Sequence, residues 1–179
     1  TSAVTPSDPV VAARLALADL RHRQGDYEAA FDLVDPLLEG EGDGRIQGRA
    51  WLVRGRLLET AERYTEAATA YESALGIEGI EVETVEEARI SLARTLLATG
   101  QTDAATATAA ALAGDSGSAI MVQARLGQAR QLIDSGDARG ALALYDQILD
   151  GDVPEEDLMR AAQAGKAEAL VQLGDLDPA

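Results

Sequence analysis

Apolar residues recur along this chain three and four residues apart, in segments that short polar turns interrupt. Alanine and leucine dominate the pattern and aromatic residues are few, so it predicts an all-α protein of close-packed helices. The helices come in pairs, a first helix followed by a second. We expect first helices over 9–24, 45–61, 85–99, 118–135 and 155–173, and second helices over 27–39, 65–76, 103–113 and 138–150.

A tight turn of one kind follows each predicted first helix. Glycine ends a helix well because it tolerates the left-handed cap conformation, and a following aspartate or threonine can cap the next helix. The five turns are Gln24–Tyr27, Glu62–Thr65, Gly100–Asp103, Ser135–Ala138 and Leu173–Leu176, with Glu62 at the place of the glycine in the second.

Small residues stand in rows when these turns are aligned. One row lies seven residues before each turn glycine or Glu62, at Ala18, Gly55, Ala93, Ala129 and Ala167, in steps of 37, 38, 36 and 38 residues. A second row follows each turn, at Ala30, Ala67, Ala105 and Ala141. Small side chains let two antiparallel helices cross closely, so the rows predict tight helix pairs.

The repeat resembles the tetratricopeptide repeat (TPR). The second copy shows this best, because Trp51, Gly55, Tyr64, Ala67, Tyr71 and Ala74 all fall at the family's offsets. The resemblance implies a single right-handed α-solenoid over 1–179, with repeats at about 11–44, 45–84, 85–117, 118–153 and a half repeat at 154–175. The units exceed the family period of about 34 residues. Longer units are similar to those of bacterial cell-envelope TPR proteins, which favours a periplasmic or envelope location, with the cytoplasm as the alternative.

Three local features complete the predicted architecture. Pro36 falls inside a second helix and should kink it or leave one carbonyl unpaired. Gly40–Gly44, Gly76–Glu83 and Asp115–Gly117 are expected to be surface loops. The last helix carries many apolar residues for the end of a solenoid. It is therefore interpreted as a natural cap, as a cut through a longer array, or as an end that associates with another copy.

Charge and composition exclude several classes of function. The formal net charge is -16, which opposes binding to nucleic acid or to anionic membranes. Acidic excess with Lys166 as the single lysine fits either a high-GC genome or adaptation to high salt. The chain contains no cysteine and no run of eighteen apolar residues, so no disulfide and no membrane insertion are expected. A start at Thr1 without methionine is typical of a processed or excised piece.

Residues for catalysis or metal binding are scarce. His22 is the single histidine and stands near a helix end, where a cation suits the helix dipole. Glu39, Glu41 and Asp43 lack the spacing of a calcium-binding EF-hand loop. No phosphate-binding or nucleophile motif occurs. We therefore expect no enzyme, no metal site and no cofactor.

By resemblance, the first helices line a concave groove that binds a peptide or a helix of a partner protein. Helical spacing directs three sets of residues toward it: Leu15, Ala16, Asp19 and His22; Arg49, Leu52, Val53, Arg56 and Glu59; and Glu87, Ile90, Ser91, Arg94 and Leu97. The fourth copy offers Gln123, Leu126, Gly127, Arg130 and Ile133, and the fifth Ala164, Glu168 and Val171.

Two rows stand out among these positions. Arg56, Arg94 and Arg130 occupy one place in successive repeats, and Leu52, Ile90 and Leu126 lie four residues before them. We predict that these six residues bind a partner with acidic groups or a free C-terminus. The alternative is that each arginine forms an ion pair within its helix or across helices, with Glu59 and Asp134 as the candidate partners of Arg56 and Arg130 within their helices.

Other functions remain open beside groove binding. The clamp of TPR receptors for chaperone tails uses lysines and asparagines, whereas the matching places here hold Leu15, Asp19, Val53, Glu87 and Ser91, which argues against that subtype. A homo-oligomer stacked through the last helix is one alternative, and a regulatory segment of a larger protein is another.

Overall fold

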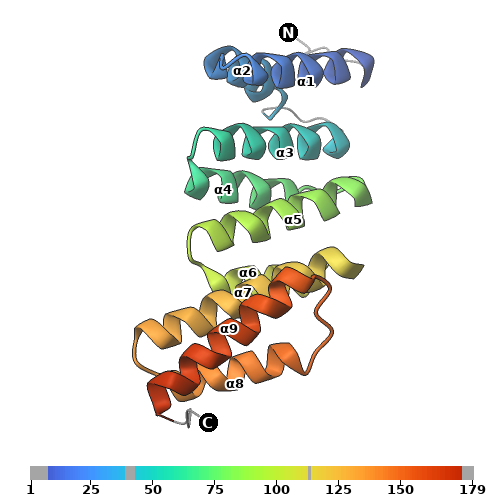
Figure 1. Cartoon of the computed structure of the whole chain (residues 1–179). Helices are drawn as coiled ribbons and strands as arrows, with labels where there is room; N and C mark the ends of the chain where they lie inside the picture. Colours follow the sequence, from blue (N-terminus) through green and yellow to red (C-terminus); the bar gives the residue numbers. More distant parts are fainter. Residues whose placement is uncertain (1–7, 39–42, 113, 175–179) are drawn as a thin grey trace. The chain divides into compact units, whose positions relative to one another are not determined.

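The computed structural model describes residues 8–38, 43–112 and 114–174, and these residues are helical almost throughout (Figure 1). The first helices are α1 (Asp8–Arg23), α3 (Gly44–Thr60), α5 (Val82–Ala98), α7 (Gly114–Asp134) and α9 (Glu156–Leu173). The second helices are α2 (Tyr27–Val34), α4 (Tyr64–Leu75), α6 (Thr102–Ala109) and α8 (Ala138–Leu149), with a 3-10 turn η1 (Asp35–Leu37) after α2. The prediction of an all-α protein of helix pairs is confirmed.

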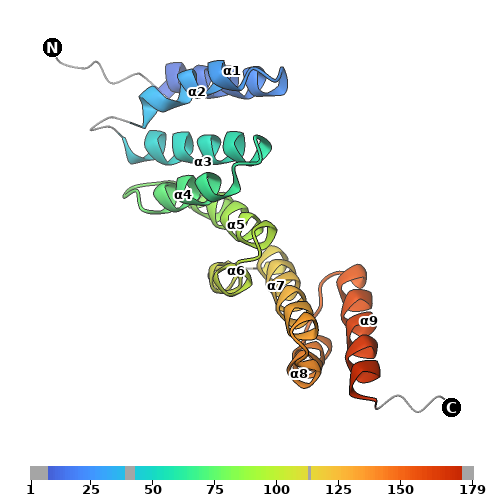
Figure 2. The same cartoon turned by 90° about the vertical axis from the view of Figure 1, so that its left-hand side faces the viewer.

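The chain divides into two compact units, one ending at Thr95 and the other beginning at Leu96, near the end of α5. In the first unit α1 packs on α2 and α3 packs on α4, as both views show (Figures 1 and 2). Its core includes Val34, Ala50 and Leu57. In the second unit α6 packs on α7, α7 on α8, and α8 on α9. Each unit therefore consists of helices that pack on their neighbours in the sequence, as in a helical repeat protein.

The turns between paired helices share one hydrogen-bonded geometry. In the first, the N–H of Gly25 donates to the carbonyl of His22 at 2.9 Å, and the N–H of Asp26 donates to the carbonyl of Arg21 at 3.0 Å. These two bonds define a Schellman motif, which requires a positive φ at its central residue. In these turns the φ angle is +78° at Gly25, +59° at Glu62, +76° at Gly100 and +87° at Gly136, and Gly174, which ends α9, has a φ of +72°.

The first row of small residues makes room for aromatic side chains and close helix crossings. A Cβ atom built on Gly55 would overlap the ring of Tyr71, so only glycine fits against this fully buried tyrosine. Ala18, Ala93 and Ala129 are also fully buried. Ala167 is exposed instead, since no second helix follows α9 in the described part of the chain. In α9 it is Gly165 whose missing side chain makes room for the ring of Tyr145.

Several predicted boundaries need correction. Asp115–Gly117, expected to be a loop, lies in the first turn of α7. Acidic and hydroxyl residues suit a helix N-terminus as well as a loop, so their composition did not decide between the two. A Cβ atom on Gly117 would lie 2.9 Å from Cβ of Leu112, so this glycine permits close packing on the preceding turn.

The other loops and Pro36 differ less from expectation. The helix α5 begins at Val82, inside the predicted loop Gly76–Glu83. Most of the predicted loop Gly40–Gly44 lies outside the described residues, but Gly44 itself begins α3. At Pro36 the second helix changes from α to 3-10 geometry, which agrees with the expected disturbance of the helix.

A candidate binding groove on the first helices

The first unit contains a groove along α1, α3 and the start of α5. Three adjoining cavities form it, because neighbouring cavities share Ala12 and Arg49 at one junction and Asp19 and Arg56 at the other. The central cavity has a volume of about 220 Å³. It is lined by Ala12, Leu15, Ala16, Asp19, Arg49, Leu52, Val53, Arg56, Thr84 and Glu87. Most of these are positions that helical spacing directed toward a groove.

The floor of the groove is apolar and belongs to the core. Leu15 and Leu52 are each 4% exposed and Val53 is 5% exposed, so only the edges of these side chains reach the cavity. Ala12 and Ala16 are exposed beside them on α1. Leu52, which the sequence placed in an outward row, is therefore a core residue with one edge in the groove. The groove therefore offers a ligand a shallow apolar floor and one wall of small side chains.

Arg56 crosses the groove to the opposite helix. Its Nη1 donates to Oε1 of Glu87 on α5 at 3.1 Å, and both side chains are about half exposed. This contact is the alternative of an ion pair across helices, whereas Glu59, the candidate partner within α3, bonds Tyr71 and Thr95 instead. An ion pair this exposed is worth at most about 1 kcal/mol, so a ligand carboxylate could replace Glu87 at little cost.

Glu59 anchors a polar cluster at the end of the groove. The hydroxyl of Tyr71 donates to Oε2 of Glu59 at 2.6 Å, and Oγ1 of Thr95 donates to Oε1 at 2.5 Å. Burial, and then the hydrogen bond to Glu59, raises the pKa of Tyr71 far above its ordinary value. Because these residues come from α3, α4 and α5, the cluster fixes three helices around the groove.

The freest cation in the groove is Arg49. It is exposed, and it makes no hydrogen bond or ion pair with any residue that the structure describes. Its neighbour Arg45 instead bonds Asp43, the residue that caps α3. That side-chain hydrogen bond is the main cause of the lowered pKa of Asp43. Helical spacing directed Arg49 toward the groove, but the row of arginines did not include it.

Two family models match the chain, and both are described as tetratricopeptide repeat. One matches residues 42–79 and 126–179, more than half of the chain, and the other matches residues 11–35 and 87–111. The chain belongs to the tetratricopeptide repeat family. No curated protein matches it. TPR units generally mediate protein–protein interaction as non-catalytic scaffolds, which agrees with a groove on the first helices.

The remaining predicted site residues of this TPR chain lie outside the three cavities of the groove. Ile90 is half-buried on α5, and Arg94 is exposed on the same helix. Leu126 and Arg130 lie on α7 in the second unit, where Leu126 packs against the core. Arg130 makes no ion pair with Asp134 in the described part of the chain. Leu52 and Arg56 line the groove, and partner binding by all six residues of the two rows stays a prediction.

The described histidine and carboxylate groups show no arrangement suited to metal binding. Within residues 8–38, 43–112 and 114–174, no three such groups gather in a way that could hold a metal ion. His22 is half-buried and meets the ring of Tyr27 edge-on at 5.6 Å. Glu39 and Glu41 lie outside the described residues, and Asp43 caps α3. None of the described helices combines the length and the apolar character that a membrane span requires.

Proposed function

We propose that this TPR chain is a non-catalytic interaction module that holds a segment of a partner protein in the groove along α1, α3 and α5. The observation that carries the proposal is the coincidence of an apolar floor, a free cation at Arg49 and a replaceable ion pair at Arg56 in one groove. Such a surface offers both hydrophobic contact and charge-assisted hydrogen bonds to a peptide.

The groove favours a partner with small or aliphatic side chains and carboxylates. The apolar side chains would lie over Leu15, Leu52 and Val53, opposite the small wall formed by Ala12 and Ala16. One carboxylate would bind Arg49. A second would bind Arg56 in exchange for Glu87, which would then turn to solvent. We also propose that Arg94 and Arg130 extend this contact in the later repeats.

The proposal is tested by capture of partners on the immobilised chain, with the groove arginines changed. The variant Arg49→Ala with Arg56→Ala should lose a partner that the wild type retains. Arg139→Ala, which removes an exposed arginine from α8, is the matched control and should retain it. Retention by all three proteins would place the interface outside the groove. The variant Arg94→Ala with Arg130→Ala then shows separately whether the later repeats contribute.

Self-association is a second candidate because α9 exposes apolar side chains. Val171 is 62% exposed, and Ala164, seven residues before it and on the same side of the helix, is also exposed. A second copy could cover this face. Sedimentation over a range of concentrations should then show an oligomer that Val171→Glu dissociates. A monomer at all concentrations would remove this candidate.

A further inference from the structure

The outer face of α1 carries an apolar stripe that stays exposed in the described part of the chain. Val10 is 48% exposed, Leu17 is 40% exposed and Leu20 is 46% exposed, and Ala13 is exposed among them. These four residues, here called the α1 stripe, follow each other at intervals of three, four and three, so they share one side of the helix. They face away from the core that Val11, Leu15 and Ala18 form with α2.

The positions equivalent to Ala13 and Leu20 are buried in α3 and α9. The turn residues set the alignment, which pairs the α1 stripe with Gln47, Ala50, Arg54 and Leu57 in α3, and with Met159, Ala162, Lys166 and Ala169 in α9. Ala50 and Leu57 are at most 1% exposed in a core shared with α2. Ala162 and Ala169 are fully buried in a core shared with α8. At these positions, a first helix is therefore covered by the second helix that precedes it.

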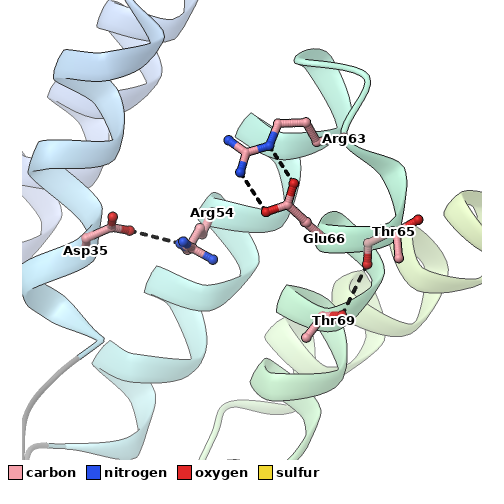
Figure 3. Close-up of polar contacts among 6 residues, drawn as sticks. All are labelled: Asp35, Arg54, Arg63, Thr65, Glu66 and Thr69. Atoms are coloured by element: carbon pink, nitrogen blue, oxygen red, sulfur yellow. Dashed lines mark hydrogen bonds and ion pairs between the residues drawn. The ribbon is translucent and has the colours of Figure 1, made fainter.

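Polar contacts at the position of Leu17 show that this side of α3 and of α9 contacts the preceding second helix or the 3-10 turn after it. Nε of Arg54 donates to Oδ1 of Asp35 in η1, just after α2, at 2.9 Å (Figure 3). Nζ of Lys166 lies 2.6 Å from Oδ1 of Asp146 on α8. Leu17 occupies this position in α1, as Leu92 does in α5, where it is only 5% exposed. The residues of the α1 stripe are thus as apolar as those of a buried helix face, but they are exposed.

The charges beside the stripe indicate what would cover it. Arg14 and Arg21 lie three residues before and four residues after Leu17, so they border the stripe. Arg14 is exposed and has no partner among the described residues. Nη1 of Arg21 lies 3.9 Å from Oδ2 of Asp26. This border is basic in a chain whose formal net charge is -16. Two copies paired through the stripe would bring arginines together, whereas an acidic helix would bring opposite charges together.

We infer that the α1 stripe docks an amphipathic helix of a partner protein whose apolar face is bordered by acidic residues. The helix would lie on α1 as α2 lies on α3 and as α8 lies on α9. This site is separate from the groove, because the stripe and the groove use different sides of α1. The inference does not depend on the proposed groove function.

A synthetic peptide with the sequence of residues 27–38 is a suitable probe. It copies the segment that covers α3, carries Glu28, Asp32 and Asp35, and contains no basic residue. The peptide is titrated into the full chain labelled with ¹⁵N, and amide shifts are followed. We expect shifts centred on Leu17 and Leu20.

Matched variants make the test decisive. Leu17→Glu with Leu20→Glu should weaken binding at least about tenfold, since both apolar contacts are lost and acidic groups are opposed. Circular dichroism should show an unchanged fold because both side chains are nearly half exposed and lie outside the core. Val82→Glu, at an apolar side chain 68% exposed on α5, is the control and should bind normally. A peptide with its three acidic residues changed to lysine should also bind more weakly, most of all at low salt.

Four outcomes would overturn the inference. Shifts centred on the groove at Arg49 and Arg56, or on α3 at Ala50 and Leu57, would place the peptide elsewhere. Equal affinity of the acidic and lysine peptides would refute the charge argument. The absence of shifts at about millimolar peptide would show that the stripe binds no such helix. Dissociation of a dimer of the chain by the Leu17→Glu, Leu20→Glu variant would assign the stripe to a second copy instead.

Discussion

Replacing Glu62 with glycine should stabilise the first unit. Glu62 is the one described residue other than glycine with a positive φ, +59°, and it stands where the other turns carry glycine. The left-handed conformation costs an ordinary residue about 1–2 kcal/mol. Glycine avoids this cost but loses about 0.5–1 kcal/mol through its freer unfolded chain. The difference predicts a net gain of about 0.5–1 kcal/mol for Glu62→Gly.

Urea unfolding followed by the fluorescence of Trp51 measures this gain. Trp51 is the single tryptophan and lies on α3, the helix that Glu62 follows. With an m value of about 2 kcal/mol/M, the midpoint should rise by about 0.25–0.5 M. Glu62→Ala is the control, because it removes the same charge and keeps a Cβ atom. A glycine variant no more stable than the alanine variant would refute the backbone argument and assign any gain to charge.

Three further predictions concern helix packing and charge. Gly55→Ala should cost about 1–3 kcal/mol because its methyl group overlaps the ring of Tyr71, whereas Gly76→Ala, with no atom nearer than 3.6 Å, should be close to neutral in the same assay. The raised pKa of Tyr71 means that the folded state keeps a proton which the unfolded state loses, so the stability of the first unit should fall as pH rises above about 10. Tyr71→Phe should remove this fall, and an unchanged slope would contradict it. Lys166→Ala should change the stability of the second unit by less than about 1 kcal/mol, since both side chains of its ion pair are partly exposed. A larger loss in calorimetry would show that the pair is stronger than this exposure suggests.

Local rules predicted the turns better than the helix starts. The glycines of the Schellman turns could be identified because only a positive φ demands glycine at one fixed place in each repeat. The predicted start of α7 was wrong because the sequence of Asp115–Gly117 suits a first helical turn as well as a loop. The exposure of Ala167 was not foreseen because it depends on which helix follows α9, and that information is not local.

The site was predicted in outline, and its contacts were not. Helical spacing selected most residues that line the groove, since spacing alone fixes which side of a helix a residue occupies. It could not show that Glu59 bonds Tyr71 and Thr95, which lie 12 and 36 residues away in the sequence. It also could not distinguish the free Arg49 from the paired Arg56, because pairing depends on the neighbouring helix.

The residue of the next first helix that contacts each buried tyrosine affects how such repeats vary. The hydroxyl of Ser91 on α5 donates a hydrogen bond to the hydroxyl oxygen of Tyr71 on α4, and the ring of Tyr145 on α8 packs against Gly165, the equivalent residue of α9. The bulk of this one residue sets how closely a second helix approaches the first helix that follows it. A substitution at this residue would alter the distance between one second helix and the next first helix, and would leave the other contacts between repeats unchanged. The packing of each pair of neighbouring repeats can therefore change independently. A groove can adapt to a new ligand through one such change, without changes in the other repeats.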